Sequence, residues 1–186
     1  MLKDGQWSQL GSLPRGIVGG CQVEIANKIV FIGKEDNNKV LDVDARLLFT
    51  GGYSTSNTGQ VLVMDLQQET WQPVSHITRA RRDFSCAVLG NKVYVVGGHN
   101  GANPSVEILT VAGDDYSVAD GPDLPGHVRT YGNTIVYKGV VYFIEVHGKV
   151  LKLKGDGSGW EDFKDIGEDV HRAVVTDEDA LFNNKE

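Results

Sequence analysis

The sequence predicts an all-β protein built from several copies of one strand-rich unit, and three observations support this prediction. A short apolar segment recurs along the chain, a valine-led strand pattern follows it, and an arginine precedes the next copy. The composition agrees, because 23 glycines against 5 prolines suit many tight turns between strands. A hydrophobic share of 40% in 186 residues is typical of a folded domain with its own core.

The first repeated segment is NKVYVVGG at residues 91–98. Similar runs, NKIVFIGK, ARLLFTGG and GVVYFIEV, stand at residues 27–34, 45–52 and 139–146. Each run is rich in β-branched and aromatic residues, which predicts a strand followed by a loop. We expect the glycine pair to allow close backbone approach and unusual dihedral angles where the strand ends.

The second and third repeated features keep the same order along the chain. A strand pattern opens at a valine, and an aromatic residue follows ten positions later, in the pairs Val61 and Trp71, Val106 and Tyr116, and Val150 and Trp160. An arginine then precedes the next predicted first strand, at Arg82, Arg129 and Arg172. One unit therefore contains four predicted strands and spans about 45 residues, close to the ~50 residues of a kelch unit.

The chain resembles the kelch-repeat family in the residues that carry these features. They are Gly51 and Gly52 with Asp65 and Trp71, and Gly97 and Gly98 with Val106 and Tyr116. The resemblance covers nearly the whole chain and implies that each unit is a four-stranded blade of a β-propeller. The physics agrees, because stacked blades cover one another's apolar faces and leave short edges exposed.

About four blades are expected, one of them shortened, as an array of units at residues 1–45 (partial), 46–82, 83–127, 128–171 and 172–186 (partial). The interval from Gly33 to Gly51 is 18 residues, whereas Gly51 and Gly97 are 46 residues apart. A fourth strand and the following first strand are therefore missing near residues 44–46, through divergence or through loss of an exon. A strained closed array and an incomplete, open propeller both agree with the sequence.

The charge and the cysteines narrow the function classes. With 18 basic and 25 acidic residues the formal charge is −7, which disfavours nucleic acid and anionic membranes as partners. Cys21 and Cys86 both fall in apolar, strand-like segments. We expect two buried, reduced thiols in a cytoplasmic protein, with a disulfide as the alternative.

No catalytic residue, metal ligand or cofactor is predicted. The five histidines lack metal-site spacing and are interpreted as solvated loop residues. The glycine-rich stretch GDGSG at residues 155–159 lies between two strand patterns, so it predicts a hairpin turn rather than a phosphate loop.

The segment TRARRDF at residues 78–84 concentrates positive charge in an acidic chain. Arg82 recurs as Arg129 and Arg172, so either a structural pair within the blade or partner binding would explain it. Arg79 and Arg81 do not recur in this alignment, which makes them better candidates for recognising an acidic partner.

The family resemblance implies protein–protein recognition through the second-to-third-strand loops and the fourth-to-first connectors. Carried onto this chain, the candidate partner-binding residues are Tyr53, Asn57, Arg79, Arg81, Arg82, His99, Asn100 and Arg129. Many kelch propellers are substrate receptors of cullin-type ubiquitin ligases and use a separate BTB domain for this. We therefore expect a binding module for a protein or peptide, and a ligase-adaptor part if this chain belongs to a longer protein.

The alternative is an enzyme, because some kelch-like propellers oxidise or isomerise sugars. The oxidases of this type need a tyrosine–cysteine pair and a set of histidine ligands. We find no matching histidine set in the sequence, so the binding module ranks above the enzyme.

Overall fold

The computed structural model describes residues 77–79, 81, 83–98, 104–171 and 173, and the backbone of the strands that precede residue 77. The regular elements in this part of the chain are all strands. No helix in it is long and apolar enough to span a membrane.

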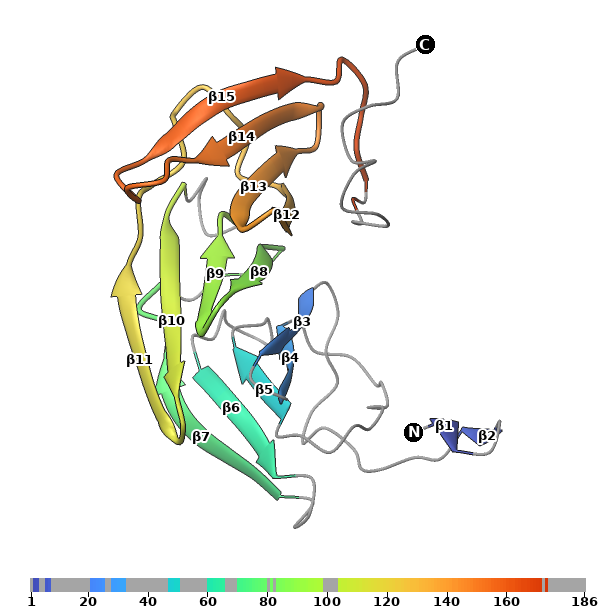
Figure 1. The fold of residues 1–186 in the computed structure, drawn as a ribbon, viewed down its shortest axis with the longest axis vertical. Coiled ribbons are helices and arrows are strands. Elements are labelled where there is room, and N and C mark those ends of the chain that lie inside the picture. Colours follow the sequence, from blue (N-terminus) through green and yellow to red (C-terminus); the bar gives the residue numbers. More distant parts are fainter. Residues whose placement is uncertain are drawn as a thin grey trace.

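Three sheets stand side by side in an arc (Figure 1). The first sheet contains β3 (Cys21–Ile25), β4 (Lys28–Ile32), β5 (Leu47–Thr50), β6 (Gln60–Asp65) and β7 (Thr70–His76). The second contains β8 (Ser85–Leu89), β9 (Lys92–Val96), β10 (Val106–Ala112) and β11 (Asp115–Asp120). The third contains β12 (Gly132–Tyr137), β13 (Val140–Glu145), β14 (Lys149–Leu153) and β15 (Trp160–Asp165), and a separate two-stranded sheet joins β1 (Leu2–Lys3) to β2 (Gln6–Trp7).

The second and third sheets are four-stranded antiparallel meanders. Their first strands lie on the inner side of the arc and their aromatic fourth strands on the outer side (Figure 1). Strand β8 packs beside β3 on one side and β12 on the other. The predicted all-β, blade-like architecture is confirmed, and the described part of the arc is open.

The first sheet differs from the other two because it has five strands and one parallel pair. Strand β4 runs parallel to β5, with Ile29 opposite Leu47, whereas all the other pairs in this sheet are antiparallel. Both β4 and β5 come from copies of the repeated NKVYVVGG-like segment. The sheet therefore combines two second strands with one first, one third and one fourth strand. This composition matches a chain that lacks the intervening fourth and first strands.

Tight hairpins join the first and second strands of both complete meanders. In the second sheet Gly90 has φ 62° at the first central position, and in the third sheet Lys138 and Gly139 have φ 45° and 73°. Two-residue turns with positive φ match the right-handed twist of paired strands. The residues 154–159 likewise join β14 to β15 as a hairpin loop, so the predicted turn at GDGSG is confirmed.

Both faces of the second sheet are buried, which explains why the strand at residues 92–96 is apolar without alternation. Val93 and Val95 belong to an apolar cluster with Ile77 and Phe84. On the opposite face, apolar residues of the second and third sheets form one cluster: Tyr94, Val96, Val106, Val141, Phe143, Leu151 and Trp160. The indole Nε1 of Trp160 donates to the carbonyl oxygen of Pro122 at 2.8 Å.

The glycine pair at the end of β9 meets the connector that leads into the next sheet. Gly97 and Gly98 have φ 67° and 101°, which side-chain-bearing residues rarely adopt. The amide of Gly98 donates to the carbonyl oxygen of Thr130 at 2.9 Å, and a Cβ on Gly97 would overlap that same carbonyl. The predicted close backbone approach is therefore a contact between neighbouring sheets.

Cys86, on the inner strand β8, is disulfide-bonded, which corrects the expectation of a reduced thiol. Strand β3, which begins at Cys21, packs beside β8. Sequence separation hides this proximity, because the two segments are first strands of different units and meet only when the sheets stand side by side.

Candidate functional site

The candidate site is one end of the second sheet, where two connectors and a loop meet. We call it the connector end and define it by residues 77–79, 81, 83–84, 97–98, 104–105 and 121–131. The parts are joined by hydrogen bonds: the Leu124 amide donates to the Pro104 carbonyl oxygen at 2.8 Å, and Thr130 Oγ1 donates to the Gly98 carbonyl oxygen at 3.1 Å. These are the loop and connector types that the family resemblance implies for recognition.

Arg81 lies inside the connector end with a side-chain exposure of 0%. Its guanidinium donates to the carbonyl oxygens of Arg79 (3.2 Å), Gly97 (2.8 Å) and Ser105 (2.7 Å), to Ser105 Oγ (2.7 Å) and to Glu107 Oε2 (2.6 Å). A guanidinium has five N–H donors, so this count accounts for all of them. Arg81 therefore has no donor left for a partner and no surface through which to contact one.

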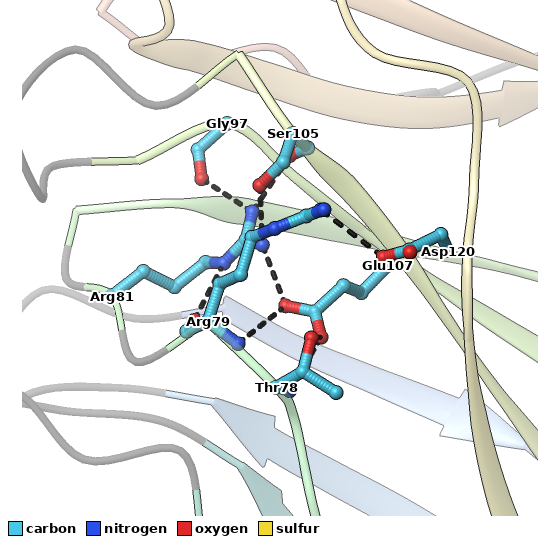
Figure 2. A network of polar contacts seen from close by, with 7 residues as sticks. All are labelled: Thr78, Arg79, Arg81, Gly97, Ser105, Glu107 and Asp120. Atoms are coloured by element: carbon cyan, nitrogen blue, oxygen red, sulfur yellow. Dashed lines mark hydrogen bonds and ion pairs between the residues drawn. The ribbon is translucent and has the colours of Figure 1, made fainter.

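Glu107, on β10, is the second fully buried charge, at 0% exposure. Besides Arg81, its carboxylate accepts from the amide of Thr78 at 2.5 Å, from Thr78 Oγ1 at 2.7 Å and from the amide of Arg79 at 3.3 Å. Figure 2 shows these contacts converging on one carboxylate. Glu107 therefore attaches the backbone of residues 78–79 to the sheet.

Burial lowers the pKa of Arg81, because removal from water penalises its charge. The charge of Glu107 and the hydrogen bond to it oppose this shift, and the positive charge of Arg79 adds to it. Two guanidinium groups thus lie close enough to repel each other, and Glu107 neutralises the buried one.

Arg79 differs from Arg81 although it is two residues away. Its side chain is 40% exposed, and Nη1 lies 3.1 Å from Oδ1 of Asp120, the last residue of β11. Nη1 itself is buried and donates no hydrogen bond, so this ion pair lacks hydrogen-bond geometry. Figure 2 shows the Arg81 group directed at Gly97 and Ser105 and the Arg79 group directed at Asp120.

Arg129 is exposed on the connector that precedes the third sheet. The hairpins pair Leu89 with Lys92 and Tyr137 with Val140, and counting back equally from both turns places Arg129 where Arg81 stands. The sequence match of Arg129 with Arg82 is therefore one residue off. The third sheet has no buried arginine at this position, so the same repeat position is internal in one blade and external in the next.

The other candidate residues are not placed. Tyr53, Asn57, Arg82, His99 and Asn100 lie outside the described residues, so their proposed part in binding stays a prediction.

Two exposed histidines pair with aspartates in the third sheet. His147 Nδ1 lies 2.8 Å from Asp169 Oδ1, and His127 Nε2 lies 3.0 Å from Asp162 Oδ1. The hydrogen bond and the charge of His147 lower the pKa of Asp169. Within the described residues, no group of three or more His, Cys, Asp or Glu side chains could hold a metal ion.

Sequence reasoning missed the residues that organise this end of the sheet, namely Ser105, Glu107 and Thr130. A signal for Glu107 did exist, because it is a charged residue at the start of the strand VEILTV, directly after a buried valine. A buried glutamate requires a positive partner. The arginine-rich connector at residues 78–84 could have been predicted to supply this positive partner.

Comparisons with known proteins agree with this fold. A Kelch motif model matches residues 80–111, which include the buried Arg81–Glu107 pair. The chain is 29% identical over 106 residues to Kelch repeat and BTB domain-containing protein 2 of ectromelia virus (strain Moscow), covering 55% of this chain and 18% of that protein. It is 38% identical over 66 residues to an F-box/kelch-repeat protein of Arabidopsis thaliana, covering 33% of this chain and 18% of that protein.

A solved structure of YjhT shares the fold, with a TM-score of 0.52 at 9% identity over 61% of this chain and 40% of that one. The chain spans less than a fifth of the length of the two curated relatives above, at 18% of each. The matched motif, the related sequences and the arc of stacked sheets together support a kelch-repeat protein.

Proposed function

We propose that this chain is a protein-interaction module and that it binds a protein or peptide at the connector end. The observation that carries the proposal is the contrast between two neighbouring arginines. The guanidinium of Arg81 donates all its hydrogen bonds to groups inside the protein. Arg79 extends from a backbone that the Glu107 carboxylate holds in place, and its side chain pairs with Asp120. A rigid support that presents a partly exposed cation is suited to recognition, because little side-chain and loop ordering remains to oppose binding.

An acidic segment is the proposed partner. Arg79 and Arg129 are both on connectors of the proposed face, and arginine pairs with carboxylates through two parallel hydrogen bonds. Neither nucleic acid nor a membrane is proposed as a partner, because the net charge of −7 opposes both.

The relatives suggest a more specific role. One relative carries a BTB domain and another an F-box in its name, and the aligned part makes up 18% of each of these proteins. We propose that this chain corresponds to the substrate-receptor part of such a protein, which would present a target to a cullin-type ubiquitin ligase.

A binding module is favoured over the alternative, a kelch-type enzyme acting on sugars. The polar groups gathered at the connector end, Arg81, Ser105 and Glu107, are buried and bonded to one another. Such groups hold the connectors together and are not directed at an open site where a substrate could react.

The cytoplasmic location stays a prediction from the sequence, and the disulfide-bonded Cys86 argues against it, because structural disulfides are rare in the cytoplasm. Trapping free thiols with an alkylating reagent at the moment of cell lysis tests the location: a reduced Cys86 agrees with the cytoplasm, and a fully oxidised one contradicts it.

Peptide display tests the proposed function. A random peptide library is selected on the purified chain, and enriched peptides are synthesised with a fluorescent label for anisotropy titration. We expect Arg79→Gln to weaken binding about tenfold or more, as for loss of a charge-assisted hydrogen bond. Lys92→Gln removes the same charge at the opposite, exposed end of the sheet and serves as the matched control. No enriched peptide, or equal losses in both variants, would contradict the proposal.

A further inference from the structure

Arg79 and Asp120 form an ion pair that is incomplete in two respects. The distance of 3.1 Å between Nη1 and Oδ1 is within ion-pair range, but Nη1 makes no hydrogen bond. Arginine and carboxylate at their best form two parallel N–H···O bonds. A carboxylate in a better position could therefore form stronger hydrogen bonds with Arg79 than Asp120 does in the free protein.

The two members of the pair differ in how firmly they are held. The backbone of Arg79 donates its amide to Glu107 and its carbonyl oxygen accepts from Arg81, so two buried side chains fix the start of its side chain. Asp120 ends the outer edge strand β11, and its side chain is 68% exposed. The cation is thus supported by the protein interior, while its counter-ion is mostly in water.

The charges around the pair explain why Arg79 requires an anion. Arg81 lies close enough for the two guanidinium groups to repel each other. Glu107 compensates Arg81 at 2.6 Å, and Arg79 has the Asp120 carboxylate as its ion-pair partner. Asp123 also acts on Arg81. Removing Asp120 therefore leaves Arg79 without its ion-pair carboxylate, and an external carboxylate can take that place.

We propose that Asp120 occupies Arg79 in the free protein and that an aspartate or glutamate side chain of the bound peptide replaces it. This inference rests on the proposed function and specifies the chemistry of its ligand. Asp120 then acts as an internal competitor. It lowers the affinity of the chain for acidic peptides. It leaves the affinity for peptides with the matching amide residue unchanged, because these have no carboxylate to exchange.

The size of the competitor effect follows from the exposure of the pair. Ion pairs between exposed side chains change an equilibrium constant by up to about fivefold. We therefore expect Asp120→Asn to tighten binding of acidic peptides by about two- to fivefold. Asp115→Asn removes the same charge at the other end of the same strand, where Asp115 is exposed, and controls for net charge.

The experiment uses the display-selected peptides, each synthesised with its acidic residue and with the matching amide, Glu to Gln or Asp to Asn. Fluorescence anisotropy measures both forms against the wild-type chain and the Arg79→Gln, Asp120→Asn and Asp115→Asn variants. We expect the wild type to bind the acidic form about tenfold or more tightly than the amide form, and Arg79→Gln to lose that preference. Of the two aspartate variants, only Asp120→Asn should increase the preference. Far-UV circular dichroism verifies that each variant is folded.

The outcomes separate this inference from the proposed function. Selected peptides without acidic residues, a preference that survives Arg79→Gln, or equal effects of Asp120→Asn and Asp115→Asn would overturn the exchange and leave a protein-interaction module standing. Failure to select any peptide would overturn the proposed function and the inference with it.

Discussion

The buried pair of Arg81 and Glu107 makes the most direct prediction about stability. Substituting Arg81→Met leaves the Glu107 carboxylate at 0% exposure without its cation and removes the Arg81 donor from the carbonyl oxygen of Gly97. The Ser105 carbonyl oxygen loses one of its two donors and keeps the amide of Gly97. Breaking a buried pair by removing one partner costs about 3–5 kcal/mol. Because a domain is stable by about 5–15 kcal/mol, this substitution removes a large share of the total.

The neighbouring sheet suggests a variant that restores part of this loss. Strand pairs Val106–Val96 and Val150–Ile144 correspond, so Glu107 in one blade matches the buried Leu151 in the next. An apolar residue is therefore compatible with this position. We expect the double variant Arg81→Met, Glu107→Leu to be less destabilised than the sum of the two single variants by about 2 kcal/mol, because neither charge is left alone.

Urea unfolding followed by tryptophan fluorescence and by far-UV circular dichroism measures these free energies, provided that the two probes give coincident transitions. Arg81→Lys is the milder variant if Arg81→Met does not fold. Lysine keeps the charge and loses the planar fork, for which we expect a cost of about 1–3 kcal/mol. Arg81→Met within about 1 kcal/mol of the wild type, or a double variant equal to the sum of the singles, would refute the reasoning.

The remaining predictions concern the glycine pair, the aromatic fourth strand and a surface ion pair. Gly97→Ala should lower the free energy of unfolding by well over the ~1 kcal/mol expected for Gly90→Ala, because both have positive φ but a Cβ on Gly97 also overlaps a carbonyl oxygen of the next connector. Equal losses for the two variants in urea would contradict that contact. Trp160→Phe should cost about 1–2 kcal/mol through the lost indole hydrogen bond and the smaller ring, and a stability equal to wild type would show that the bond contributes nothing. The pKa of Asp169 is held below its usual value by the hydrogen bond and charge of His147, so this pair stabilises the fold above the ordinary aspartate pKa and is lost as pH falls through the lowered one. NMR titration should show the Asp169 pKa rising toward its ordinary value in His147→Ala, and an unchanged pKa would exclude His147 as the cause.

The candidate site shows how far sequence reasoning extends. The family resemblance predicted that the connectors and the loop form a recognition face, and the structure brings them together at one end of the second sheet. Which arginines are buried and which are exposed was not predicted. Arg79 and Arg81 are identical in type and two positions apart, and their difference depends on Ser105 and Glu107, which are distant in sequence.

Local periodicity determined the strands of this protein. The predicted apolar segments that the structure describes are strands, because their β-branched and aromatic residues suit a pleated surface that is covered on both faces. The repeat period then determined the order of strands in the two complete meanders, since antiparallel neighbours joined by short turns pair with the next segment in the chain.

Tertiary packing alone decided the features that join one repeat to another. The parallel pairing of β4 with β5 and the bonded state of Cys86 both depend on which segments of different units become neighbours. Burial likewise separated the internal Arg81 from the exposed Arg129 at the same repeat position. The physical reason is that periodicity reports the environment averaged over repeats, whereas charge burial, disulfide formation and strand exchange depend on a single contact in space.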